Sequence, residues 1–325
     1  MAPTRSLLLI LLASGLAFAQ TPLFNDGTAF GGSKVFAEGL NPFGNAARFN
    51  RAATGTYLTW IQGNDGAKDT FEALKNPTLF SGLTENSRAI RTRAYGIAYV
   101  DKGVHSSFLH EETTAAIVNP NFGTALPNSI ELRRSVVDRT CVGAGDFDQG
   151  SGYGVVMRVE RWRTGSAINP QGLSDYLSYS NTQTNRTLVT FDLGYALEIT
   201  QGIRFGATVD RVLPRHFGDV YEGPQARAGF QVDLGDMAQL SVETDINKAM
   251  RMPYPIRQRV SAVSLRIPAS PILTLTFGAE HRKLGDQAQT RGGFTLFLNS
   301  PTWRLGAGFQ FSQERPLAGL TFSGF

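Results

Sequence analysis

Apolar and polar side chains alternate along much of the second half of the sequence. In residues 189–198 the odd-numbered positions carry Val, Phe, Leu, Tyr and Leu, whereas the even-numbered positions carry polar or small residues. The same alternation recurs in residues 203–210, 226–234, 238–245 and 303–311. Because successive side chains on a β-strand point to opposite faces, each segment predicts a strand with one apolar and one polar face. Short turns at residues 200–202 and 235–236 predict hairpins between them.

Further strands are predicted on both sides of this region, with less regular patterns. They are residues 91–100, 104–109, 129–142, 153–160, 257–267, 272–282, 293–298 and 317–325. Loops are predicted at residues 119–123, 143–152 and 164–185, of which the last is polar and long enough to be extracellular. Residues 56–86 have the least legible pattern, and residues 69–75 within them predict a short helix that Asn76-Pro77 ends. We therefore expect about 12 to 14 strands.

The polar face of these strands distinguishes a membrane barrel from a soluble sandwich. It carries mixed acidic and basic residues on neighbouring strands: Arg158, Glu160, Asp192, Glu198, Arg204, Asp210, Arg227, Asp233, Glu243 and Asp245. In a barrel that spans lipid, apolar side chains face outwards and polar ones line the lumen, where opposite charges pair across strands. We therefore predict an all-β fold, an antiparallel transmembrane β-barrel with these residues lining its lumen. A secreted β-sandwich with a solvated charged face is the alternative.

The two ends of the chain carry patterns typical of export and membrane-assembly signals. Residues 1–19 combine a basic start, a short apolar core and a small-x-small end, which predicts a signal peptide cut before Gln20. The C-terminal segment resembles the last strand of bacterial outer-membrane barrels, which the barrel-assembly machinery reads. Gly319, Leu320, Phe322 and Phe325 are the predicted assembly signal. Phe325 is out of phase with Leu320 and Phe322, so either Gly324 forms a bulge or Phe325 lies outside the strand.

Composition adds limits to this interpretation. No stretch approaches the roughly 20 apolar residues of a membrane-spanning helix, and the single thiol, Cys141, excludes an intrachain disulfide. The net charge of +4 is not clustered, which argues against nucleic-acid binding. The cations are 25 Arg and 6 Lys. Arginine binds carboxylates and phosphates through two parallel hydrogen bonds, which suits a lumenal charge network or contacts with lipopolysaccharide, although a GC-rich genome would give the same bias.

The region after the signal peptide is rich in Gly, Asn and Phe. Gly31-Gly32, Val35 and Ala37 are followed by residues 41–47, Asn-Pro-Phe-Gly-Asn-Ala-Ala. This arrangement resembles the N-terminal region of the FadL-like outer-membrane family, which includes fatty-acid and hydrocarbon transporters and the TraF-type and PorV-type proteins. It departs from the family pattern in lacking the preceding acidic pair and in having Asn45 where Leu is usual.

The resemblance implies a domain organisation. Residues 20–55 would form a hatch or plug inside the barrel, residues 56–325 would form the barrel itself, and the strand number would be the higher one, about 14. Phe30, Phe36, Phe43 and Phe49 would then contribute an apolar ligand site, although packing the hatch against the wall would require the same residues. The alternative is an ordinary glycine-rich entry into the first strands.

Candidate chemistry is sparse. Residues 105–107, His-Ser-Ser, and 110–112, His-Glu-Glu, form the only cluster that suggests a hydrolase or metal site. On a strand, His105 and Ser106 point to opposite faces, so they do not form a nucleophile and its base. His105 and Ser107 would share a face, but no barrel-lipase motif surrounds them. We expect no catalysis, no metal site and no cofactor.

These observations favour an outer-membrane β-barrel that passes or binds small, hydrophobic molecules. Two alternatives remain open: a non-specific porin, and a structural barrel associated with secretion or conjugation. The expected partners are outer-membrane lipid and lipopolysaccharide, the barrel-assembly machinery and a hydrophobic small-molecule ligand.

Overall fold

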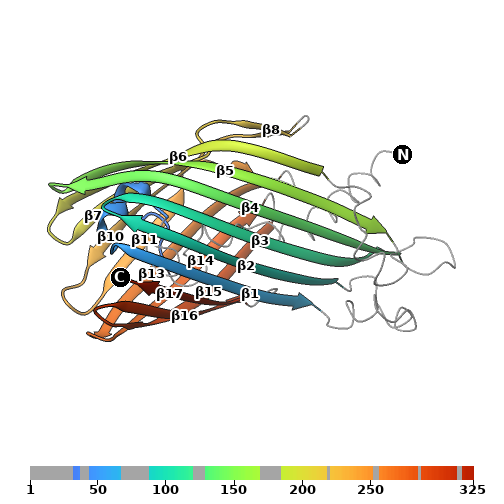
Figure 1. Cartoon of the computed structure of the whole chain (residues 1–325). Helices are drawn as coiled ribbons and strands as arrows, with labels where there is room; N and C mark the ends of the chain where they lie inside the picture. Colours follow the sequence, from blue (N-terminus) through green and yellow to red (C-terminus); the bar gives the residue numbers. More distant parts are fainter. Residues whose placement is uncertain are drawn as a thin grey trace.

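The chain forms one closed β-barrel in the computed structural model (Figure 1). The structure describes residues 32–36, 44–66, 88–119, 129–168, 184–217, 220–251, 256–284, 287–312 and 317–325. A 3-10 helix, η2 (Ala46–Arg51), precedes the strands. The strands are β1 (Gly55–Gly66), β2 (Arg88–Asp101), β3 (Val104–Asn119), β4 (Ser129–Asp148), β5 (Ser151–Ile168), β6 (Thr184–Thr200), β7 (Ile203–Asp210), β8 (Arg215–Phe217), β9 (Val220–Glu222), β10 (Gln225–Asp233), β11 (Gln239–Asp245), β12 (Ala249–Arg251), β13 (Ile256–Ser270), β14 (Leu273–Leu284), β15 (Gln287–Asn299), β16 (Trp303–Ser312) and β17 (Leu317–Gly324).

The strands pair antiparallel in a ring. The order runs β11-β10-β7-β6-β5-β4-β3-β2-β1-β17-β16-β15-β14-β13, and a direct pairing of β11 with β13 closes it. β12 continues along β13 beyond β11 and adds no position, and β8 and β9 form a separate hairpin. The ring therefore has 14 strands, which confirms the antiparallel barrel and the higher strand number. Every strand has two neighbours, so no edge is left to hydrogen-bond with lipid.

The short turns that follow β2, β4, β6 and β13 gather at one end of the barrel, and β1, β3 and β5 end at the other, before the longer connections in the sequence (Figure 1). Two of the turns, at Lys102-Gly103 and Gln149-Gly150, have both residues at positive φ, which matches the twist of the strands they join. Long extracellular loops and short periplasmic turns are the usual arrangement in outer-membrane barrels. We refer to the two ends as the short-turn end and the long-loop end.

The two faces of the wall differ as the alternation predicted. The outer face carries a belt of exposed apolar side chains that includes Trp60, Tyr95, Ile97, Phe108, Val155, Met157, Val189, Leu193, Phe230, Val242, Phe277, Phe294, Leu305, Phe309, Leu320 and Phe322. The inner face carries the buried polar residues, among them Arg158, Asp192, Arg227 and Thr295. This arrangement is the reverse of that in a soluble protein, in which apolar side chains face the interior and polar side chains face the water.

The predicted loop at residues 143–152 is wrong. β4 continues to Asp148 and β5 begins at Ser151, so only residues 149–150 form a turn. The glycines in this stretch serve close packing: a Cβ on Gly145 would lie 1.7 Å from the carbonyl oxygen of Ala46, and one on Gly154 would lie 2.4 Å from its carbonyl carbon. Glycine here makes room for a segment against the inner wall, which sequence composition alone does not distinguish from a loop.

Several strands are longer or less regular than predicted. β1 occupies residues with the least legible pattern, because Tyr57 and Ile61 face inwards and are apolar, so the alternation disappears. β3 extends ten residues beyond Leu109, and the polar segment 164–185 contributes the end of β5 and the start of β6. The predicted short helix at residues 69–75 and the predicted signal peptide lie outside the described residues.

The C-terminus resolves the phase conflict seen in the sequence. Leu320 and Phe322 face outwards on β17, whereas Phe325 follows the end of that strand. The amide of Phe325 donates to the carbonyl of Thr302 at 3.0 Å, and its ring lies 6.0 Å from the ring of Tyr57, centroid to centroid. The terminal aromatic therefore lies outside the strand, one of the two predicted outcomes. In the part of the chain that the structure describes, no helix has the length and apolar character needed to cross a membrane.

Candidate functional site

A short piece of the chain lies against the inside of the barrel wall. We call residues 32–36 and 44–51 the inner segment. Asn45 caps η2 by accepting from the amide of Ala47 at 3.0 Å, and its side-chain amide donates to the carbonyls of Val35 at 2.8 Å and Tyr195 at 3.1 Å. One side chain thus joins both parts of the inner segment to strand β6. The Asn45 that departs from the family pattern has a direct structural role.

Acidic residues of the wall bind the first part of the inner segment, residues 32–36. The hydroxyl of Ser33 donates to Oε2 of Glu243 at 2.6 Å, and the amide of Val35 donates to the same oxygen at 3.0 Å. Lys34 forms an ion pair with Asp210, and both side chains are almost fully buried. β11 supplies Glu243 and β7 supplies Asp210, so the inner segment is attached to two different strands.

The acidic residues belong to a larger buried network on the inner face of β4 to β11. Arg227 donates to Asp245 at 2.7 Å and to Glu243 at 3.0 Å, and Gln225 donates to the second oxygen of Asp245 at 2.6 Å. Both carboxylates and the guanidinium are nearly excluded from solvent. Because a buried charge is stable only when paired and hydrogen-bonded, each of these groups depends on the others.

A second part of the network lies on the neighbouring strands. Arg158 of β5 pairs with Asp192 of β6 and with Glu160, and Arg139 of β4 pairs with Glu160 at 2.7 Å. The backbone amide of Arg211 donates to Asp192 at 2.8 Å, which places this group beside the loop after β7. We call the two parts together, with Lys34 and Asp210, the ionic network.

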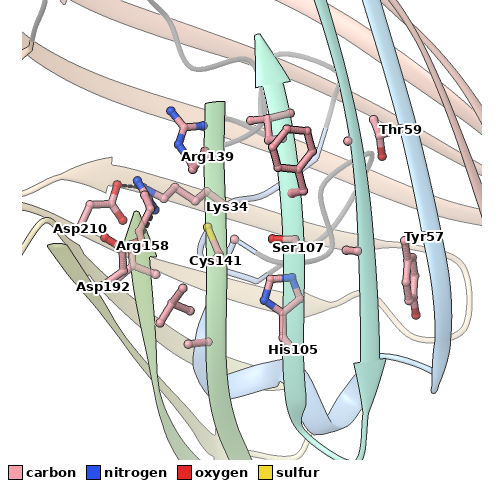
Figure 2. Close-up of a pocket in the computed structure, with 18 of the residues that line it drawn as sticks. Lys34, Tyr57, Thr59, His105, Ser107, Arg139, Cys141, Arg158, Asp192 and Asp210 are labelled. Carbon is pink, nitrogen blue, oxygen red and sulfur yellow. Dashed lines mark hydrogen bonds and ion pairs between the residues drawn. The ribbon is translucent and has the colours of Figure 1, made fainter. Parts of the chain in front are cut away.

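A cavity separates part of the inner segment from the wall (Figure 2). Its volume is about 90 Å³. In the figure Lys34, Arg158, Asp192 and Asp210 gather on one side, whereas Tyr57 and Thr59 of β1 lie on the opposite side. Small and apolar side chains from β2 to β5, including Ala98, Leu109, Cys141 and Val156, complete the lining. The cavity is therefore charged on one flank and largely apolar on the other.

The structure places all ten predicted lumen residues on the inner half of the wall, in two groups. Seven of them belong to the buried ionic network: Arg158, Glu160, Asp192, Asp210, Arg227, Glu243 and Asp245. Glu160 joins the same network through Arg158 and Arg139. Arg204 and Asp233 form a separate, half-buried pair at 2.7 Å near the short-turn end, where Glu198 is also half-buried.

Sequence reasoning missed several members of the network. Lys34 and Ser33 lie outside any strand, so no alternation pointed to them. Arg139 lies in a stretch where charged residues occupy both even- and odd-numbered positions, such as Arg134, Asp138 and Arg139, so the two-residue period is hidden. Its partner Glu160 was recognised, and this opposite charge on the neighbouring strand was the one clue to Arg139.

Two of the four predicted phenylalanines, Phe36 and Phe49, lie in the described residues. Phe49 is fully buried and packs with Ala46 and Val156, and its ring lies 4.8 Å from the ring of His105. Phe36 is also buried and lines a second cavity of about 250 Å³ near the short-turn end. Phe30 and Phe43 lie outside the described residues. Phe49 thus packs the inner segment against the wall, whereas Phe36 borders a cavity.

The histidine cluster divides across the wall. His105 and Ser107 face inwards and both line the cavity, whereas Ser106 faces outwards. His110 is on the outer face, where it contacts Asp138 at 2.6 Å and stacks on the ring of Tyr95. Within the described ranges, no group of three or more His, Cys, Asp or Glu side chains is arranged to hold a metal ion.

Comparison with known proteins gives matches at the level of the fold. No family model matches the sequence, and no curated protein matches it. Among solved structures, the CymD monoaromatic hydrocarbon channel is similar with a TM-score of 0.58 and 8% identity over 96% of each chain. The Pseudomonas putida toluene transporter TodX has a TM-score of 0.59 and 10% identity, over 92% of this chain and 96% of that one. The Ralstonia pickettii toluene transporter TbuX has a TM-score of 0.57 and 10% identity, over 86% and 92%.

Proposed function

We propose that this protein is a bacterial outer-membrane channel for small hydrophobic molecules, with the inner segment as its plug. The observation that carries the proposal is the attachment of the inner segment to the inner wall through Asn45, Ser33 and Lys34. A barrel with an attached internal segment restricts free aqueous flow, in contrast to an open porin lumen. The protein acts in this proposal by binding and passage, without catalysis.

The shape and lining of the cavity support a gated route. An apolar cavity of about 150 Å³ in another protein is large enough to hold benzene. The cavity here is about 90 Å³, so a single aromatic ring would enter only after the inner segment shifts. A hydrocarbon would contact the apolar flank beside Leu109 and Val156. For the inner segment to shift, its contacts with the ionic network must break.

The likeness to solved structures supports the substrate class. CymD is a monoaromatic hydrocarbon channel, and TodX and TbuX are toluene transporters. Their shared fold with this chain agrees with the FadL-like resemblance of residues 31–47. The exposed apolar belt, the predicted signal peptide and the predicted assembly signal at the C-terminus support the outer membrane as the location.

The decisive experiment compares single-channel conductance with and without the plug. We expect the intact protein in a planar bilayer to show low conductance, and a variant lacking residues 21–51 to conduct at least about ten-fold more, as an open lumen of polar lining would. A large conductance in the intact protein that the deletion leaves unchanged would favour the non-specific porin. Mass spectrometry of small molecules that copurify with the intact protein would identify the ligand class.

A single substitution provides a milder version of the deletion. Gly154→Val adds a side chain where a Cβ alone would lie 2.4 Å from the backbone of Ala46, so it should displace the inner segment and raise conductance. Ala144→Val is the matched control, because Ala144 is exposed on the outer face of the neighbouring strand β4. Equal conductance in the two variants would show that the position of the inner segment does not control conductance. Stoichiometric protein partners with no bound small molecule would instead favour the scaffold alternative.

A further inference from the structure

A group of arginines interrupts the apolar outer face of the barrel. Arg93 of β2, Arg134 of β4, and Arg161 and Arg163 of β5 all lie on the outer face, and Arg134 and Arg163 keep 43% and 41% of their side chains exposed. Three other titratable residues of the same face lie among them: His110, Glu112 and Asp138. We call these seven residues the basic band.

Strand register brings the basic band together. Arg93 is opposite Glu112, His110 is opposite Asp138, and Asp138 is opposite Arg161. Nearest cross-strand partners have Cβ atoms about 5 Å apart, so the band is one continuous surface over β2 to β5. None of these residues contributes to the ionic network, because the wall separates the two groups.

The band lies at the upper edge of the apolar belt. Arg93 is eight residues from the short turn after Asp101, and Arg161 is ten residues from the turn before Ser151. At about 3.3 Å per residue and a tilt near 40°, these positions are about 20 and 25 Å above the short-turn end. The apolar band of an outer-membrane barrel is about 25 Å tall, so the arginines lie at the level of the lipid headgroups on the long-loop side.

The carboxylates of the band neutralise only part of its charge. Arg134 pairs with Glu112 at 2.7 Å, and Arg163 pairs with Asp138 at 2.5 Å, while Arg161 donates to the amide oxygen of Asn185 at 3.3 Å. Four guanidinium groups and two carboxylates leave a net charge of +2 with His110 neutral. Arginine forms two parallel hydrogen bonds with a phosphate, which an ammonium group does not.

We propose that the basic band binds the phosphorylated headgroup of an outer-leaflet glycolipid, lipopolysaccharide, with its acyl chains lying on the belt below. Tyr95, Phe108 and Val155 provide the apolar surface directly beneath the band. Glu112 and Asp138 hold Arg134 and Arg163 in place, and Arg93 and Arg161 extend towards the lipid. The partner is defined by two features together, clustered phosphate charge and a hydrocarbon anchor, which match the two halves of this surface.

The test measures lipopolysaccharide binding to the full-length barrel in detergent. The intact protein should bind lipopolysaccharide at least about thirty-fold more tightly than the same lipid after enzymatic dephosphorylation. The double variant Arg93→Gln with Arg161→Gln should lose about thirty-fold in affinity for the phosphorylated lipid, or about five-fold per arginine. It should leave the affinity for the dephosphorylated lipid unchanged, since the apolar belt is intact.

Lys102→Gln is the matched control, because Lys102 is an exposed cation in a turn at the short-turn end. It should bind like the unmodified protein. Equal affinity for the two lipids, or equal loss in Lys102→Gln and the double variant, would overturn the proposal. Gel mobility before and after heating verifies that each variant is folded. If the double variant fails to assemble, Arg161→Gln alone is tested in its place. The affinity of the intact protein for lipopolysaccharide is also measured as salt rises, since phosphate binding must then weaken.

Discussion

The ionic network inside the barrel and the basic band outside it use the same residue types in opposite ways. Inside, Arg227, Glu243 and Asp245 are almost completely buried and fix one another at 2.7 to 3.0 Å. Outside, Arg134 and Arg163 remain more than one-third exposed although each has a carboxylate partner. Charge pairing therefore makes the inner residues depend on one another, whereas the paired arginines of the outer face keep much of their side chains exposed.

The largest expected effect comes from breaking the network at its centre. Arg227→Met would leave Glu243 and Asp245 buried without their shared cation, so we expect the free energy of unfolding to fall by about 3–5 kcal/mol. Urea titration of the barrel in detergent, followed by gel mobility, measures the change. Arg163→Met removes an exposed arginine from the basic band and should cost less than about 1 kcal/mol.

A third variant separates lost pairing from lost packing. Replacing Arg227, Glu243 and Asp245 together by apolar residues of similar volume removes all three charges at once. Replacing a buried ionic group in this way is often neutral, so this variant should recover most of the stability that Arg227→Met loses. If the triple variant is less stable than Arg227→Met, the paired charges themselves stabilise the barrel beyond satisfying one another.

A smaller effect is expected where the network holds the inner segment. Lys34→Met removes the partner of Asp210 and leaves its carboxylate short of a charged hydrogen bond, which costs about 1–3 kcal/mol. Because Lys34 is outside the strands, the loss should appear as opening of the inner segment rather than unfolding of the barrel. Amide hydrogen exchange of residues 44–51 should accelerate, with urea stability of the strands retained. Lys102→Met serves as the control, and equal exchange in both variants would contradict the attachment.

The smallest effects concern the outer face below the band. Phe322→Asp places a charge on the lipid-facing side of β17 near the short-turn end and should cost on the order of 1–2 kcal/mol. Deleting Phe325 removes a residue that lies outside the strand and should impair assembly less. Quantifying the heat-modifiable form in outer-membrane fractions ranks the two variants. Greater loss on deleting Phe325 would show that the terminal aromatic itself carries the assembly signal.

Much of the fold could be predicted because residues that face lipid and residues that face the lumen alternate along each strand of a membrane barrel. The segment 189–198 and its neighbours gave the correct faces for β6, β7, β10, β11 and β16, since lipid outside and polar groups inside impose opposite requirements on adjacent residues. The prediction failed where that contrast vanishes. β1 has apolar Tyr57 and Ile61 on its inner face, and β4 and β5 carry Gly145 and Gly154 where Ala46 packs against them.

The candidate site was predicted only in part for a related reason. Alternation identified Asp192, Arg227 and Glu243 as inward-facing, but not their partners in the inner segment. Lys34 and Ser33 are recognisable only after the chain has brought them beside strands some 176 to 210 residues away. The basic band was missed because the predicted strand of residues 153–160 ended before Arg161 and Arg163, which β5 places on its outer face.

The sequence by itself determined the class of the wall: antiparallel strands, an apolar outer face, a polar inner face and close to the observed strand number. These properties are local, since each follows from the alternation of neighbouring residues. Only the tertiary structure decided where β11 meets β13 to close the ring, where the inner segment lies and which charges are buried together. Such facts depend on contacts between residues distant in the chain, and no local period encodes them.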